Sequence, residues 1–152
     1  MVEQTILSFF EKDHRRLDAL FERFQELKHD NFTEGEQFFK EFKYGLQKHI
    51  LWEEELLFPL FEKKSGISSG PTEVMRQEHL SILRVLRKIA EKVDLNDFST
   101  DGEEKELFEI LSRHNLKEEN ALYPMIESSA SLEEKKEVFK KMEAFSEERY
   151  RY

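Results

Sequence analysis

The sequence contains no cysteine and few residues that break helices. The lack of cysteine excludes disulfide bonds, thiolate metal sites and cysteine nucleophiles. Only three prolines and five glycines occur in 152 residues, and the chain is rich in glutamate, lysine, leucine and phenylalanine. This composition favours a mostly helical protein, and the length favours one domain with a hydrophobic core of its own.

Excess positive charge and long hydrophobic runs are also missing. The net charge of −9 argues against a nucleic-acid or anionic-membrane partner. No apolar run approaches the roughly 20 residues of a membrane-spanning helix. Charged residues near the N-terminus, Glu3, Glu11 and Lys12, argue against a signal peptide. We therefore expect a soluble, cytoplasmic protein with no nucleic-acid and no membrane partner.

A pattern of potential metal ligands occurs twice, 65 residues apart, and uses four of the five histidines. In each half, a histidine is followed 35 residues later by His-x-x-x-Glu and then by a short apolar run that ends in proline. The matched pairs are His14 and His79, His49 and His114, Glu53 and Glu118, Glu54 and Glu119, and Pro59 and Pro124. This doubling predicts one metal cluster built by two similar helix pairs.

Four segments show the alternating spacings of 3 and 4 that are typical of helices packed side by side. They cover about residues 3–28, 34–63, 71–93 and 101–127. The second segment carries Leu56 and Leu60 after Glu53, and the fourth carries Ala121 and Met125 after Glu118, all in the apolar seam. We predict an all-α fold: an antiparallel, up-down four-helix bundle over residues 1–128. A short C-terminal helix within residues 129–152 is expected to pack on or beside the bundle in the same domain.

Turn and capping residues separate these segments. Thr33 with Glu36 resembles a capping box, and so does Ser131 with Glu134, where a fifth helix would begin and then end near Arg149. Pro71 suits the first turn of a helix. Pro59 and Pro124 are expected to kink or locally break their helices beyond the cluster.

Glu53 and Glu118 fall in apolar seams, where an unpaired carboxylate costs several kcal/mol. Protonation can neutralise such a carboxylate, but a cation held by neighbouring neutral imidazoles is the more economical answer. Residues i and i+4 lie on one helical face, so each His-x-x-x-Glu can offer its imidazole to one ion and its carboxylate to a second. Four histidines and two bridging carboxylates suit two ions, and donors without sulfur fit iron, manganese or zinc.

Four stretches resemble the hemerythrin-like, or HHE cation-binding, domain over about residues 5–127. They are Asp13-His14, His49-x-x-x-Glu53-Glu54 with Leu57-Phe58-Pro59, Glu78-His79, and His114-x-x-x-Glu118-Glu119 with Leu122-Tyr123-Pro124. The resemblance implies a four-helix bundle around an oxo- or hydroxo-bridged, non-haem di-iron centre. It also implies that His14, His49, His79 and His114 are ligands and that Glu53 and Glu118 bridge the irons.

The chain departs from the oxygen-carrying hemerythrins at Met75, where those proteins use a fifth histidine. The resemblance is therefore to the broader group associated with oxygen, nitric oxide, peroxide or iron. We expect a protein that binds, senses or buffers oxygen, nitric oxide or iron. The alternatives are a di-iron enzyme acting on peroxide or nitric oxide, and a helical interaction domain that holds zinc or no metal. No catalytic residue is assigned.

Several side chains near the motifs have alternative interpretations. Glu54 and Glu119 lie five residues after a histidine and are alternative ligands. Two members of Glu53-Glu54-Glu55 must face elsewhere, toward solvent or as hydrogen-bond acceptors for a ligand histidine. We expect Tyr44, Trp52 and Tyr123 to serve in packing. The C-terminal helix either covers the bundle or contacts a protein partner or a second copy.

Overall fold

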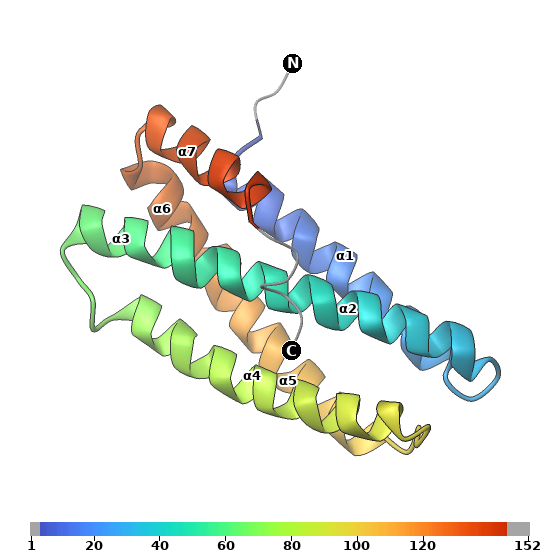
Figure 1. Cartoon of the computed structure of the whole chain (residues 1–152). Helices are drawn as coiled ribbons and strands as arrows, with labels where there is room; N and C mark the ends of the chain where they lie inside the picture. The colour runs from blue at the N-terminus through green and yellow to red at the C-terminus, as the bar shows by residue number, and fades with distance from the viewer. Residues whose placement is uncertain (1–3, 146–152) are drawn as a thin grey trace.

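A computed structural model of the chain describes residues 4–145, and within that range the fold is all-helical (Figure 1). The predicted helical class is therefore confirmed. The helices and their bounds are α1 (Ile6–Leu27), α2 (Phe32–Trp52), η1 (Glu53–Leu57), α3 (Phe58–Ser65), α4 (Pro71–Asp94), α5 (Asp101–Lys117), η2 (Glu118–Leu122), α6 (Tyr123–Ser129) and α7 (Leu132–Glu143).

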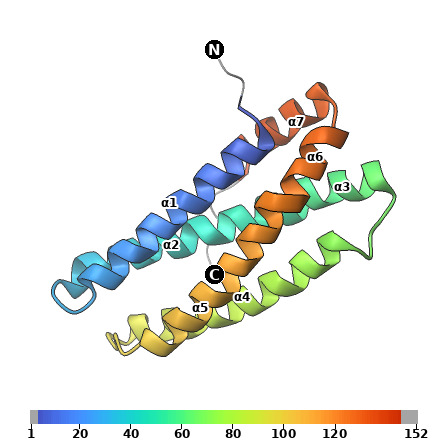
Figure 2. The ribbon, with the colours of Figure 1, turned by 180° about the vertical axis from the view of Figure 1, so that it is seen from behind.

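The long helices form two hairpins. In one, α1 turns back into α2, and η1 and α3 continue the line of α2 (Figures 1 and 2). In the other, α4 turns back into α5, which continues through η2 and α6. Contacts between α1 and α6 and between α3 and α6 join the two hairpins. Elements 65 residues apart in the sequence thus occupy equivalent places in the two hairpins.

Capping residues set the helix ends. Ser131 caps α7 in a capping box with Glu134, and Pro71 lies in the first turn of α4, as predicted. The prediction of a capping box at Thr33 was wrong, because Asn31 is the N-cap of α2. The Asn31 side chain accepts a hydrogen bond from the Glu34 backbone N–H. Asparagine outranks threonine as a cap, so α2 begins earlier. The predicted end of the last helix near Arg149 lies outside the described residues.

Each hairpin contains one π-helical turn immediately before its proline. The backbone N–H of Phe58 bonds the Glu53 carbonyl, and that of Tyr123 bonds the Glu118 carbonyl, each five residues back. Proline has no N–H, and its ring crowds the carbonyl four residues earlier, so a wider turn relieves that contact. The predicted break beyond the cluster is thus a wide turn that begins at Glu53 and Glu118 themselves.

The wide turns shift the buried face by one residue. Leu57 and Phe61 are buried in the first hairpin, and Leu122 and Ile126 in the second. The predicted seam residues Ala121 and Met125 are exposed instead, and Leu56 and Leu60 are only partly buried. An α-helical count of 3 and 4 cannot anticipate the extra residue that a π turn adds.

Two apolar clusters fill the interior. One surrounds Phe24, Phe42, Leu86 and Leu107, near the hairpin turns. The other surrounds the two π turns and includes Val138 and Met142 of α7, so α7 covers that end of the helices. Between residues 4 and 145, no helix combines the length and the apolar character needed to cross a membrane.

Candidate metal centre

All six predicted ligands are buried between the two hairpins. The structure exposes at most 2% of the surface of any of them. The first hairpin brings His14 from α1, His49 from α2 and Glu53 from η1, and the second brings His79 from α4, His114 from α5 and Glu118 from η2. The pseudo-equivalent positions predicted from the sequence therefore face each other in space.

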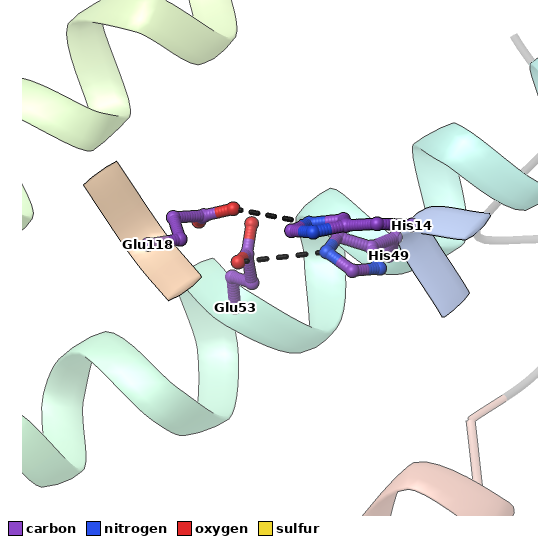
Figure 3. A group of neighbouring side chains, drawn as sticks. All are labelled: His14, His49, Glu53 and Glu118. Atoms are coloured by element: carbon purple, nitrogen blue, oxygen red, sulfur yellow. Dashed lines mark ion pairs between the residues drawn. The ribbon is translucent and has the colours of Figure 1, made fainter. Parts of the chain in front are cut away.

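The six side chains form two overlapping groups that share both carboxylates. In the first group, His14, His49, Glu53 and Glu118 each offer an atom within 4.8 Å of the others (Figure 3). The second group replaces the two histidines with His79 and His114 under the same limit. Figure 3 shows the four side chains of the first group pointing toward one another, with His49 and Glu53 on one continuous ribbon and His14 and Glu118 on two others. Each group has the size of a single-ion site.

The glutamates stand between the histidine pairs. Glu53 places Oε1 3.0 Å from His79 Nε2 and Oε2 3.5 Å from His49 Nε2, so its two oxygens face different hairpins. Glu118 Oε1 lies 3.3 Å from the Nε2 atoms of both His14 and His114. This arrangement is what two carboxylates shared between two cation positions require.

Every one of the four histidines also has a carboxylate at Nδ1, on the outer side of its ring. The pairs are His14 with Glu119 (2.7 Å), His49 with Asp13 (2.8 Å), His79 with Glu54 (2.6 Å) and His114 with Glu78 (2.8 Å). Because Nδ1 then carries the proton donated to the carboxylate, Nε2 is left to face the centre as a donor for a cation. The carboxylates fix both the tautomer and the orientation of each ring.

Three of these outer carboxylates are held in turn by basic side chains. Arg15 donates to Glu119 at 2.7 Å, Arg16 donates to Asp13 at 2.9 Å, and Lys117 donates to Glu78 at 2.5 Å. By their spacing from a histidine, Glu54 and Glu119 were alternative candidates for ligands. Their carboxylates lie at Nδ1 instead, and neither belongs to the two inner groups.

Tyr123 was expected to serve in packing, but its hydroxyl lies inside the first group. The oxygen is 2.5 Å from Glu53 Oε2, 3.0 Å from Glu118 Oε1, 3.2 Å from His49 Nε2 and 3.3 Å from His14 Nε2. Tyr123 follows Glu118 by five residues, and the π turn brings these two residues onto one face. A search restricted to spacings of 3 and 4 misses it. By contrast, Trp52 is buried in the apolar cluster, as expected.

The side chains of the centre do not satisfy all of their own polar atoms, and a cation would satisfy the one that remains. Glu118 Oε2 is buried and has no hydrogen-bond partner among the described residues. A carboxylate oxygen left in this state is costly, and native proteins rarely keep one. The imidazole and carboxylate donors, without sulfur, suit iron, manganese or zinc. We conclude that the residues present fit a metal cluster.

Without a cation, the centre balances its charges with protons. Burial lowers the pKa of His49, but Glu53 and Asp13 outweigh burial and raise it to about 10. Burial likewise lowers the pKa of His114, and Glu118 and Glu78 raise it to about 10. Burial raises the pKa of Glu53, yet the facing histidines bring it well below its usual value. A cation entering the centre must displace protons from these imidazoles.

Comparison with known families supports this interpretation. The family model described as the Hemerythrin HHE cation binding domain matches residues 5–126. Searches among curated proteins and among solved structures each returned no match. The matched range contains all six inner residues and their four outer carboxylates. This chain therefore belongs to the hemerythrin HHE cation-binding domain family.

Proposed function

We propose that this protein is an antiparallel four-helix bundle that holds a pair of iron ions and uses them to bind, sense or buffer oxygen, nitric oxide or iron. His14 and His49 would hold one ion, His79 and His114 the other, and Glu53 and Glu118 would bridge the two. The observation that carries the proposal is the pair of overlapping donor groups with two shared, buried carboxylates. Bound iron would supply Lewis acidity and redox chemistry.

The chain's own residues then have three tasks. The outer carboxylates orient the imidazoles and keep their Nε2 atoms directed inward. The apolar cluster around the π turns keeps bulk water from the centre, since Phe58, Leu57 and Leu122 are nearly or fully buried there. The rings of Phe10 and Phe58 lie 5.2 Å from His49 and 5.6 Å from His79, so they limit ring movement.

An enzyme acting on peroxide or nitric oxide is the second candidate. Met75 is buried in the apolar cluster one helical turn before His79. A thioether is a poor donor for iron beside oxygen and nitrogen ligands. The ion at His79 and His114 would therefore have few protein donors, which favours exchange of small ligands there.

The test is metal content, measured by elemental analysis with an ultraviolet–visible spectrum, on iron-loaded protein. We expect two iron ions per chain in the parent and a loss of both in Glu53→Gln, because one shared carboxylate serves both positions. Glu55→Gln is the matched control, since Glu55 lies in the same turn but outside both groups. Unchanged iron content in Glu53→Gln would overturn the proposal, and turnover faster than that of free iron would favour the enzyme.

A further inference from the structure

The two hairpins match at every polar position of the centre except one. The six inner residues and the four outer carboxylates pair off at a spacing of 65 residues, with an acid at each outer position. At the position that follows each shared glutamate by five residues, the first hairpin has Phe58 and the second has Tyr123. Both side chains are fully buried. Among the groups that face the inside of the centre, the two hairpins thus differ by a single oxygen atom.

That oxygen lies within one of the two donor groups. The Tyr123 hydroxyl is within 3.3 Å of a polar atom of His14, His49, Glu53 and Glu118, the four members of the first group. Phe58 instead stacks its ring on His79, with centroids 5.6 Å apart and planes 15° apart. The second group therefore has an aromatic face where the first has an oxygen.

Packing alone does not account for a hydroxyl at this position. Phe58 fills the equivalent place with the same ring and no polar atom, so the apolar surroundings accept phenylalanine. Moving a hydroxyl into the interior is unfavourable unless polar atoms receive it. Among residues 4–145, the polar side chains that contact this hydroxyl are the four members of the first donor group, of which Glu53 and Glu118 are shared with the second.

We propose that Tyr123 is a fifth protein ligand, through its phenolic oxygen, for the ion held by His14 and His49. The phenolic O–H bond breaks as the oxygen binds the ion, and the proton is released to solvent together with those that the metal displaces from the imidazoles. This inference rests on the proposed function and deepens it. The two ion positions then differ: five protein donors surround one and four surround the other. Phenolate oxygen is an established donor to ferric iron in proteins. An added small ligand is therefore directed to the position between His79 and His114.

The experiment is visible absorption and resonance Raman spectroscopy on the protein loaded with ferrous iron and oxidised in air. We expect a broad phenolate-to-iron charge-transfer band and Raman bands of a coordinated tyrosine ring. The band should be lost in Tyr123→Phe and kept in Tyr44→Phe, the matched control on α2 outside the centre. Ring-deuterated tyrosine should shift the Raman bands of the parent protein, which identifies the bound ring as a tyrosine even if the variant does not fold.

Iron analysis on the same samples separates this inference from the proposed function. Two ferric ions per chain without a tyrosinate signature would overturn the role of Tyr123 and leave the di-iron proposal standing. A tyrosinate band that persists in Tyr123→Phe would do the same. A chain that takes up no iron would overturn both proposals.

Discussion

Each histidine of the centre is held through both ring nitrogens. Nε2 faces a shared glutamate or the Tyr123 hydroxyl, and Nδ1 donates to a carboxylate from another helix. His14 and His79 take their outer carboxylate from the opposite hairpin, whereas His49 and His114 take it from their own. The orientation of every ring therefore depends on the packing of a neighbouring helix.

Loss of an outer carboxylate charge is expected to weaken metal binding without abolishing the fold. In Glu54→Gln and Glu119→Gln the amide still accepts a hydrogen bond, but the imidazole becomes less basic. We expect a roughly 10–100-fold loss of metal affinity for each, the range typical of such partners. Competition with a chromogenic chelator measures it, with Glu55→Gln as control. Affinities equal to that of the parent would contradict the role given to these carboxylates.

The raised pKa values of His49 and His114 predict how the stability of the metal-free protein depends on pH. The pKa of both rises to about 10 in the fold, against an ordinary value of 6.5. Their stabilising contribution is therefore complete below about pH 6.5 and is lost as the pH rises through about 10. We expect urea unfolding of the metal-free protein to show a falling free energy of unfolding across that window.

The metal-loaded protein is the control for this pH dependence, because its imidazoles are already neutral ligands. It should keep its stability between pH 6.5 and pH 10, so the stabilisation by metal grows as the pH rises. A metal-free protein with a flat profile over this window would contradict the prediction.

Among the residues of the centre, the sequence pattern revealed the six inner positions but not the tyrosine. A spacing of 65 residues and a His-x-x-x-Glu step are visible without a structure. The position of Tyr123 depends on a π turn, which changes the residue that shares a face with Glu118. The proline after each wide turn is the sequence feature that could have indicated it. On its own, that proline instead predicts a kink beyond the centre.

At the scale of elements, the helix lengths were predicted well and their buried faces less well. Each segment of alternating 3 and 4 spacing corresponds to a helix or a pair of helices joined by a π turn. Beyond each wide turn the buried face moved from Met125 to Ile126 and from Leu60 to Phe61. The 3 and 4 spacing of apolar residues reports only on regular α-helix. A π turn depends on the proline that follows it and on packing around the centre, and neither is encoded in that spacing.

The ends of α1 and α5 are joined by a buried polar cluster far from the centre. Lys28 donates to Glu104 at 2.6 Å, and both are about 4% exposed. Thr100 and Gln25 also donate to Glu104, at 2.5 Å and 3.0 Å. Lys28 lies 14 residues along α1 from His14, about 21 Å at 1.5 Å per residue. The cluster therefore fixes the hairpin ends independently of any metal.

Breaking this cluster on one side is expected to be severe. Lys28→Met leaves the Glu104 carboxylate buried without its cation, which costs about 3–5 kcal/mol of unfolding free energy. Lys40→Met is the control, because Lys40 pairs with Glu36 at the surface and such pairs contribute about 0.3–0.5 kcal/mol. Urea unfolding of the metal-free proteins measures both. Equal effects of the two substitutions would show that the cluster does not stabilise the hairpin ends.

At the scale of the whole molecule, the proposed metal would join the two hairpins where the buried charge is concentrated. Removing it with a chelator should lower the melting temperature. At 1,000 times the dissociation constant, each ion adds about 4 kcal/mol of stability. In a chain of this size, 1 kcal/mol shifts the melting temperature by about 2–4 °C, so we expect a fall of about 8–16 °C per ion. Calorimetry of the loaded and chelated protein measures it, and coincident melting curves would favour the interaction-domain alternative.

Neither hairpin alone contains all the residues of one donor group. Each donor group takes two histidines from one hairpin but needs a glutamate from each. A protein cut in the loop between α3 and α4 would therefore yield two fragments that are both unable to hold an ion as the intact chain does. When the two fragments are mixed, metal binding should return only if they associate. Metal uptake would therefore measure their reassembly.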